Sequence, residues 1–318
     1  MTEPLPTLLF APIRGITHAA FRTLFAKHFG GFDAALAPFV VPEKGRLPPT
    51  RHLHDATPAA NPALPTVPQI LTSDPAAFVA TARWFFEAGC QDVNWNLGCP
   101  HPMVTRRSFG AGLLPFPDRI HDFLTHVIDA LGPRVSVKLR LGMHAAEEAD
   151  PVLDVLNRHP LTEVTLHPRT AAQMYRGHVD LEAFSRCLKR SRHPLTFNGD
   201  IVSAASFRDR RADFPTVTRW MIGRGAVSDP FLPSRLKDPS VRPDMGRIKS
   251  FHDALLEHHR TVLSGDAHVL HKMQELWSYW TASFAPGAKA VKHVVRAKSM
   301  DAYLWHVGKA FEGSFRSA

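Results

Sequence analysis

The chain has 318 residues, of which 44% are hydrophobic and 21% charged, enough for one large α/β unit and a smaller appendage. No long apolar run is present, so we expect no membrane span. The N-terminal segment carries an acid and two prolines in place of a basic region, so we expect no signal peptide. Three cysteines do not make a disulfide framework, and we expect a cytoplasmic protein. Lys and Arg exceed Asp and Glu by 9. This excess indicates a polyanionic partner, most simply nucleic acid, unless the whole proteome is basic.

Eight short β-rich runs recur along the chain, at 8–13, 34–40, 67–72, 92–98, 136–142, 163–169, 194–200 and 219–225. Amphipathic segments such as 74–89 and 116–132 lie between them, the first opening with Asp-Pro and ending at a Gly. This alternation predicts an α/β fold, a parallel (β/α)8 TIM barrel, with an open doubly wound sheet as the competing fold.

Polar residues, Gly or Pro stand near the end of almost every predicted strand. Barrel enzymes place their chemistry at the carboxyl ends of the strands, so this recurrence favours the barrel. The residues concerned are Pro12, Pro38, Gln69, Asn96, Lys138, Arg140, His167, Arg169, Asn198, Asp200 and Arg224.

The last two strands end in "FNGDI" (197–201) and "IGRGA" (222–226). Glycines let the backbone approach a phosphate, and Arg224 adds a forked donor, so the pair predicts a phosphate site unless these are ordinary turn glycines. With no dinucleotide or ATP fingerprint present, flavin mononucleotide (FMN) fits best. Gln69, Lys138 and His167 suit the flavin ring, although Lys138 could instead be a buried, paired lysine.

Cys99 follows the fourth strand in "NLGCP" (96–100) and is either a small core residue or a reactive thiol, whereas Cys90 and Cys187 read as core. No metal site is expected, because the pairs His52/His54 and His258/His259 lack a third ligand.

From residue 245 onward the apolar spacing is helical, and we expect a barrel domain at 1–240 and a helical domain at 245–318. Lys and Arg outnumber Asp and Glu by ten to six in the helical segment. Lys289, Lys292, His293 and Arg296 share one helical face, which is either a solvated surface or a nucleic-acid contact.

Taken together, several motifs resemble those of the bacterial tRNA-dihydrouridine synthase family. They are "APIRGITHAAFR" (11–22), "PQI" (68–70), "NLGCP" (96–100), "GAGLL" (110–114), "VKLRLG" (137–142), "LHPRT" (166–170), "NGDI" (198–201) and "GRGAVSDPFL" (223–232). "PFLPSRLK" and "HKMQELWSYW" are most similar to the C-type branch, which implies uridine 16 as the target.

The resemblance implies that the protein reduces the C5–C6 bond of a uridine in the tRNA D-loop, using FMN that NADPH reduces. Hydride would reach C6 from the flavin, and Cys99 would give a proton to C5 as general acid. Asn96 matches a uracil contact, and Arg140 and Arg169 would be ligand neighbours. Flavin contacts are matched by Ala11, Pro12, Ile13, Gln69, Lys138, His167, Asn198, Gly199, Asp200, Gly223 and Arg224.

Three positions depart from the family pattern: His18 replaces an Asp, Pro168 a Gly, and Ser108 a frequent Gly. Loop 100–112 carries Arg106 and Arg107 and is expected to cover the substrate. The alternatives are an FMN barrel oxidoreductase acting on a small dihydropyrimidine or enone, and a non-catalytic tRNA-binding protein. We expect a monomer with tRNA as partner.

Overall fold

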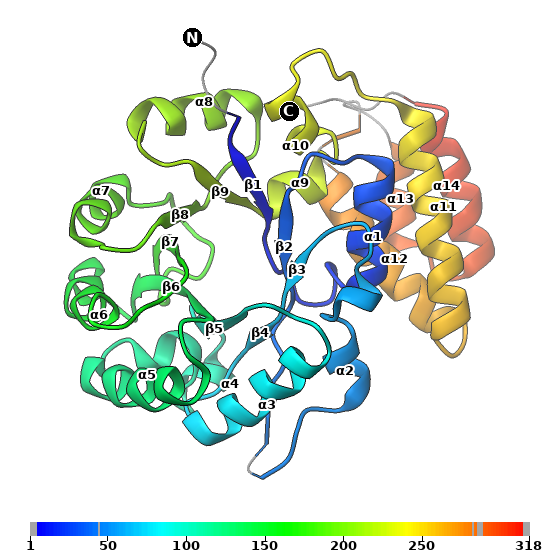
Figure 1. The fold of residues 1–318 in the computed structure, drawn as a ribbon. Helices are drawn as coiled ribbons and strands as arrows, with labels where there is room; N and C mark the ends of the chain where they lie inside the picture. The colour runs from blue at the N-terminus through cyan, green and yellow to red at the C-terminus, as the bar shows by residue number, and fades with distance from the viewer. Residues whose placement is uncertain (1–4, 44, 282, 285–288, 314–318) are drawn as a thin grey trace.

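The computed structural model describes residues 5–43, 45–281, 283–284 and 289–313 and shows a parallel barrel with helices outside it (Figure 1). Its strands follow the order β3-β2-β1-β9-β8-β7-β6-β5-β4, and every pairing is parallel. Their bounds are β1 Thr7–Phe10, β2 Ala34–Leu36, β3 Thr66–Val67, β4 Gln69–Ile70, β5 Val93–Leu97, β6 Val135–Gly142, β7 Val164–Thr170, β8 Leu195–Asn198 and β9 Arg219–Ile222.

The barrel closes at Pro68. The sequence predicts one strand at 67–72, but the structure divides it into β3, which pairs with β2, and β4, which pairs with β5. Pro68 lies between them and has no N–H to donate, so it interrupts the ladder while its carbonyl still accepts from Asn94 N at 2.8 Å. Counted as one interrupted strand, β3 and β4 complete the predicted eight-stranded TIM barrel.

Helices cover the outside of the barrel between successive strands. The longer ones are α1 Ala19–His28, α3 Pro75–Glu87, α5 Pro117–Leu131, α6 Ala149–Leu156, α7 Leu181–Arg190 and α8 Ala204–Asp213. The predicted helix start at Asp74-Pro75 is confirmed, because Asp74 Oδ1 accepts from the N–H groups of Ala76 and Ala77 at 3.0 and 3.1 Å. Shorter helices, α2 Thr50–His54, α4 Pro102–Thr105, α9 Arg224–Ser228 and α10 Leu232–Lys237, lie in the connections.

The interior of the barrel is apolar on one side and polar on the other. Leu9, Ala11, Leu36 and Met221 form a small apolar cluster separate from the main core. Facing them are polar side chains from β4 to β8, namely Gln69, Asn94, Asn96, Ser136, Lys138, Arg140, Thr165, His167, Thr196 and Asn198. Barrels usually fill this space with branched apolar residues. The polar side chains on one side are therefore not explained by packing of the interior alone.

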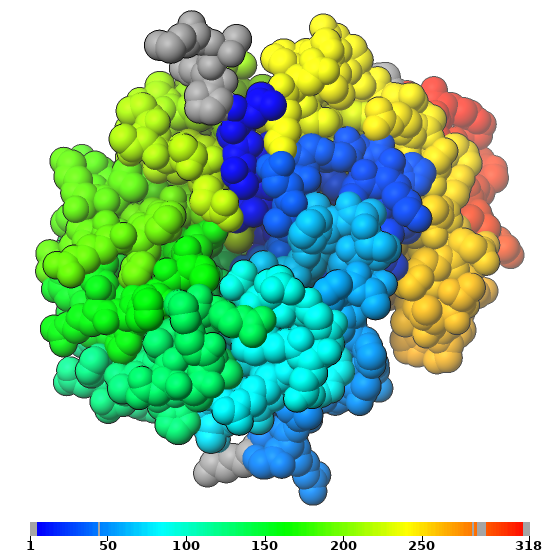
Figure 2. Space-filling model, in the orientation of Figure 1, coloured from blue at the N-terminus to red at the C-terminus, as the bar shows by residue number. Residues whose placement is uncertain are grey.

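The helical region comprises α11 Met245–Val262, α12 Asp266–Trp280, α13 Lys289–Arg296 and α14 Met300–Phe311. It lies along the side of the barrel built by the N-terminal segments, as Figure 2 shows. Phe251 of α11 packs edge-on against Phe21 of α1 with ring centroids 5.3 Å apart, and Trp280 Nε1 donates to Val227 O at 2.9 Å.

One continuous apolar core runs through both the barrel helices and the helical region. The division into domains at 1–240 and 245–318 therefore stays a prediction, although the helical region itself is present as expected. Among the described residues, no helix is long and apolar enough to cross a membrane.

Candidate active site

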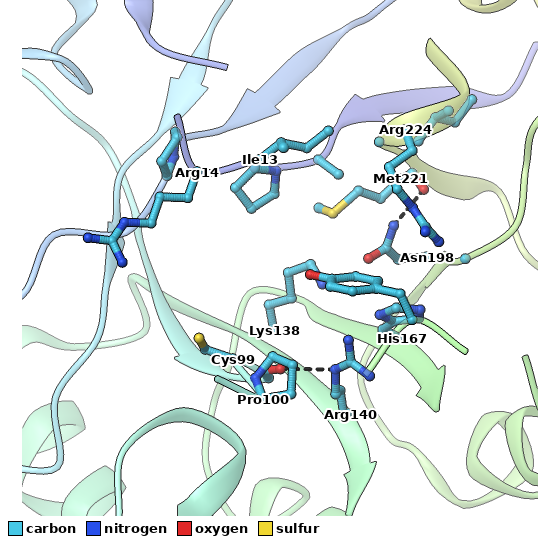
Figure 3. Close-up of a pocket in the computed structure, with 18 of the residues that line it drawn as sticks. Ile13, Arg14, Cys99, Pro100, Lys138, Arg140, His167, Asn198, Met221 and Arg224 are labelled. Atoms are coloured by element: carbon cyan, nitrogen blue, oxygen red, sulfur yellow. Dashed lines mark hydrogen bonds between the residues drawn. The ribbon is translucent and has the colours of Figure 1, made fainter. Parts of the chain in front are cut away.

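A cavity of about 430 Å³ opens at the carboxyl ends of the strands. This is the size and place expected for a cofactor or substrate site in a barrel. The structure brings the proposed acid and every proposed flavin residue to its lining: Ala11, Pro12, Ile13, Gln69, Asn96, Cys99, Lys138, Arg140, His167, Asn198, Gly199, Asp200, Gly223 and Arg224. In Figure 3, Arg14 and Cys99 lie at one end of this cavity, Asn198 and Arg224 at the other.

The backbone around Cys99 is held from both sides. Asn96 Oδ1 accepts from the N–H groups of Gly98 and Cys99 at 3.0 and 2.9 Å, which closes a tight turn directly after β5. The Cys99 carbonyl accepts from Ala111 N at 3.1 Å. Gly110 lies against the same residue, and a Cβ there would come within 2.9 Å of Cys99 O, so the turn has little room to move.

The thiol of Cys99 is half-buried and faces a cationic cavity. Burial raises its pKa above the ordinary range, and the charges of Arg140, Arg14 and Lys138 oppose that rise. The thiol is therefore protonated at neutral pH. The same cations would stabilise a thiolate once the proton had left.

Lys138 and His167 project from neighbouring strands into the same cavity. Burial and the nearby Arg140 lower the pKa of Lys138 to about 7. Burial and the surrounding cations also lower the pKa of His167 well below its ordinary value, so this ring is neutral. Arg169 Nη1 lies 3.0 Å from His167 Nε2, and because an arginine only donates, the proton of His167 belongs on Nδ1.

Arg140 and Arg169 hold the walls of the cavity. Arg140 donates to Gly98 O at 3.1 Å and to Thr170 O and Met174 O at 2.9 and 2.6 Å. Its guanidinium thus joins the Cys99 turn to the loop after β7 (Figure 3).

Arg169 is fully buried behind His167. It donates to Gly177 O at 2.7 Å and pairs with Asp200 Oδ2 at 2.6 Å. Asp200 has a positive φ of 48° and also accepts from Val179 N at 3.2 Å. Arg169 therefore supports His167 and Asp200 and, unlike Arg140, does not itself line the cavity.

The two Gly-containing strand ends lie side by side, as expected from the pairing of β8 with β9. A Cβ at Gly225 would come within 2.1 Å of Ile201 O, so only glycine allows this approach of the two connections. Within the described residues, the N–H groups of Arg224 and Gly225 at the start of α9 donate to no protein atom. These free donors and the half-exposed Arg224 guanidinium make this end of the cavity suitable for an anion.

Sequence reasoning missed several residues that line the cavity. Arg14 directly follows the predicted strand 8–13 and could have been found by its position. Tyr175 lies in the loop after β7, with the guanidinium carbons of Arg140 and Arg224 at 5.2 and 4.8 Å from its ring centroid. Tyr279 reaches the cavity from α12, and no sequence signal connects that helix to the barrel mouth.

Comparison with known proteins places the chain in a family. The family model "Dihydrouridine synthase (Dus)" matches residues 9–302. The chain belongs to the dihydrouridine synthase family. It is 29% identical over 231 residues to tRNA-dihydrouridine synthase B of Escherichia coli K12, covering 71% of this chain and 69% of that protein. It is 30% identical over 243 residues to tRNA-dihydrouridine(16) synthase of Ralstonia nicotianae, covering 74% of each.

These nearly equal identities to two branches of the dihydrouridine synthases leave the C-type assignment a prediction.

Among solved structures, the chain is similar to morphinone reductase, with a TM-score of 0.55 at 12% identity over 76% of this chain and 88% of that one. The old yellow enzyme from Trypanosoma cruzi gives a TM-score of 0.55 at 10% identity, over 77% of this chain and 91% of that one. At these identities the likeness concerns the barrel fold alone.

The structure shows the local setting of all three departures from the dihydrouridine synthase pattern. His18 caps α1 by accepting from Phe21 N at 3.4 Å, and burial and neighbouring positive groups lower its pKa to about 3. Ser108 has a positive φ of 53°, the conformation that glycine adopts without strain. Pro168 lies buried within β7, where its carbonyl accepts from Asp180 N at 2.8 Å.

The proposed RNA-contacting residues lie outside the cavity. Arg106 and Arg107 are exposed at the end of α4, and the Arg107 guanidinium carbon is 4.7 Å from the Phe109 ring centroid. Lys292 and Arg296 are exposed on α13 as expected. Lys289 begins that helix, but its side chain lies outside the described residues.

Proposed function

We propose that this chain reduces a uridine of tRNA to 5,6-dihydrouridine in the cavity above the barrel, with FMN as cofactor. One observation carries the proposal: the half-buried Cys99 thiol, whose pKa is raised by burial, lies at one end of a cavity lined by Arg14, Lys138 and Arg140, and the other end offers free backbone donors. Membership of the dihydrouridine synthase family gives the class of reaction.

The residues of the cavity fit a flavin with one terminal phosphate. The phosphate would be held by Arg224 and by the free N–H groups of Arg224 and Gly225. Lys138, which a pKa of about 7 leaves partly charged at neutral pH, and the neutral His167 offer N–H donors to the polar edges of the ring. Gln69 has its amide bonded to Asn94 and Asn96, so one Nε2 proton remains for a ligand.

When bound and reduced, the flavin would supply a hydride to C6 of the uracil. Cys99 would donate the thiol proton to C5, so that the double bond gains both hydrogens. The raised pKa of Cys99 keeps the proton on sulfur until it is needed, and Arg140, Arg14 and Lys138 then stabilise the thiolate. Arg140 also keeps the Cys99 turn in place by donating to Gly98 O.

The substrate base must leave the folded tRNA to enter the cavity, as bases do in enzymes that act on them directly. The helical region would bind the tRNA backbone through the exposed face of α13, and Arg106 and Arg107 would contact RNA near the cavity mouth. We propose NADPH as the reductant and, from the C-type motifs, uridine 16 as the target.

Purified protein would be assayed with NADPH on tRNA from a strain that lacks dihydrouridine, with the product mapped by mass spectrometry. Wild-type protein should bind flavin and form dihydrouridine. Cys99→Ala should keep its flavin but lose activity by on the order of 10²- to 10⁴-fold, because the general acid is removed. The matched control is Cys187→Ala, which alters a buried thiol away from the cavity.

Two results would contradict the proposal. Flavin-loaded protein that reduces a small enone or dihydropyrimidine but not tRNA would indicate the small-molecule alternative. Protein that binds tRNA but retains no flavin would indicate a non-catalytic binding protein. A dihydrouridine at another position would overturn only the assignment to uridine 16.

A further inference from the structure

A row of three buried amide side chains runs from the lining of the cavity down into the barrel interior. Asn94 and Asn96 face inward from alternate positions of β5, and Gln69 faces inward from β4, which pairs with β5. Gln69 Nε2 donates to Asn94 Oδ1 at 2.7 Å, and Asn96 Nδ2 donates to Gln69 Oε1 at 2.8 Å. Asn94 Nδ2 donates in turn to Ser136 Oγ at 2.8 Å.

The hydrogen bonds along this row can run in only one donor-to-acceptor direction. At its upper end, Asn96 faces the N–H groups of Gly98 and Cys99, which can only donate, so Asn96 must present its oxygen. Its Nδ2 must then face an acceptor, which fixes the orientation of Gln69 and, through Gln69, that of Asn94. Reversing any amide would bring two donors or two acceptors together.

Burial makes such a mismatch costly. The exposed fractions of Gln69, Asn94 and Asn96 are 1%, 2% and 7%. A donor or acceptor left unpaired in this setting loses its interaction with water and gains none from the protein. The row is therefore a chain in which each amide depends on the next.

Asn94 itself does not line the cavity. It lines a second pocket at the amino-terminal end of the barrel, whereas Gln69 and Asn96 line the cavity above. Asn94 can therefore affect a ligand in the cavity through its hydrogen bond to Gln69 and the bond from Asn96 to Gln69.

We propose that Asn94 is a positioning residue that, through Gln69 and Asn96, holds the Cys99 turn in its working orientation. The inference deepens the proposed function, since it concerns how the general acid is held. Two substitutions of similar size separate this role from simple packing. Asn94→Asp keeps an acceptor for Gln69, and its second oxygen can accept from the Ser136 hydroxyl, so the direction of the row survives. Asn94→Leu removes both bonds.

The test uses the flavin-loaded full chain and two readouts. The first is the rate of Cys99 alkylation by iodoacetamide, resolved by peptide mapping and followed over pH; Cys90 and Cys187 are buried and serve as internal references. The second is the split between kcat and KM for tRNA reduction. The matched control is Thr196→Val, which alters a buried interior hydroxyl that bonds Glu163 and not the row.

Asn94→Leu is expected to raise the alkylation rate of Cys99 and to lower kcat on the order of 10- to 100-fold with a smaller change in KM, because the acid is misplaced while the proposed tRNA contacts outside the cavity remain. Asn94→Asp and Thr196→Val should both stay close to wild type. A packing role predicts the reverse order, since a buried carboxylate is costlier than a leucine.

The inference fails if Asn94→Leu matches Thr196→Val in both readouts, or if Asn94→Asp is the more damaging change while still folded. If Asn94→Asp does not fold, the comparison of Asn94→Leu with Thr196→Val decides. Alkylation does not require tRNA to be the substrate. A failure of the proposed function, seen as wild-type protein inactive on tRNA, therefore stays distinct from a failure of the amide row.

Discussion

Lys138 is a buried lysine that reduces the stability of the ligand-free protein. Its pKa of about 7 in the folded protein lies below the ordinary value of 10.5, chiefly because burial disfavours the charged ammonium. Between these two pH values the unfolded chain binds a proton that the folded, flavin-free protein does not. The unfavourable contribution of Lys138 is therefore full below about pH 7 and shrinks as the pH rises toward 10.5.

We predict that Lys138→Met stabilises the flavin-free protein and weakens its retention of flavin. The gain in the free energy of unfolding should be largest near pH 6 and smaller at about pH 9, as measured by urea denaturation at each pH. Flavin content after gel filtration gives the second readout. Lys27→Met, at an exposed position of α1, is the control, and an equal gain at both pH values would count against a buried, titrating Lys138.

At the scale of elements, the turn between α4 and the short helix Gly110–Leu113 contains a strained residue. Ser108 has a φ of 53° and donates its N–H to Thr105 O at 2.9 Å. We predict that Ser108→Gly raises the free energy of unfolding by about 1 kcal/mol, because glycine adopts this conformation without strain. Ser278→Gly in α12 is the control and should lower stability instead. Thermal unfolding of the two variants would check this, and destabilisation by both would refute it.

The strands show how far sequence reasoning reaches. Polar strand ends predicted the cavity lining well, because parallel strands bring their carboxyl ends to one rim. The break at Pro68 was missed because the sequence does not show which strands pair. Only the pairing of β3 with β2 and of β4 with β5 reveals that the predicted strand is interrupted at the proline. Asn94 and Tyr279 were missed because their positions in the interior and at the cavity depend on neighbours 25 or more residues away.

At the scale of the whole molecule, the polar cavity and the helical region come from different parts of the chain. The polar half of the barrel interior comes from β4 to β8, whereas the helical region packs beside α1 and α9. Tyr279 of α12 is the point where the helical region reaches the cavity. An RNA held by the helical region would therefore lie next to the rim where its base must enter.

The exposed face of α13 is a candidate contact for the tRNA backbone. Lys292 and Arg296 project from it, and removing a cation that binds a phosphate should reduce the dependence of tRNA affinity on salt, because fewer counterions are released on binding. Changing both to Gln should weaken binding at low salt and flatten the plot of log affinity against log salt by up to about one unit per phosphate. Filter binding over a salt series measures this, with Arg83→Gln/Arg158→Gln on the barrel as the charge-matched control. Equal slopes in the two double variants would mean that the α13 face is merely solvated, and that the excess positive charge acts on tRNA from elsewhere.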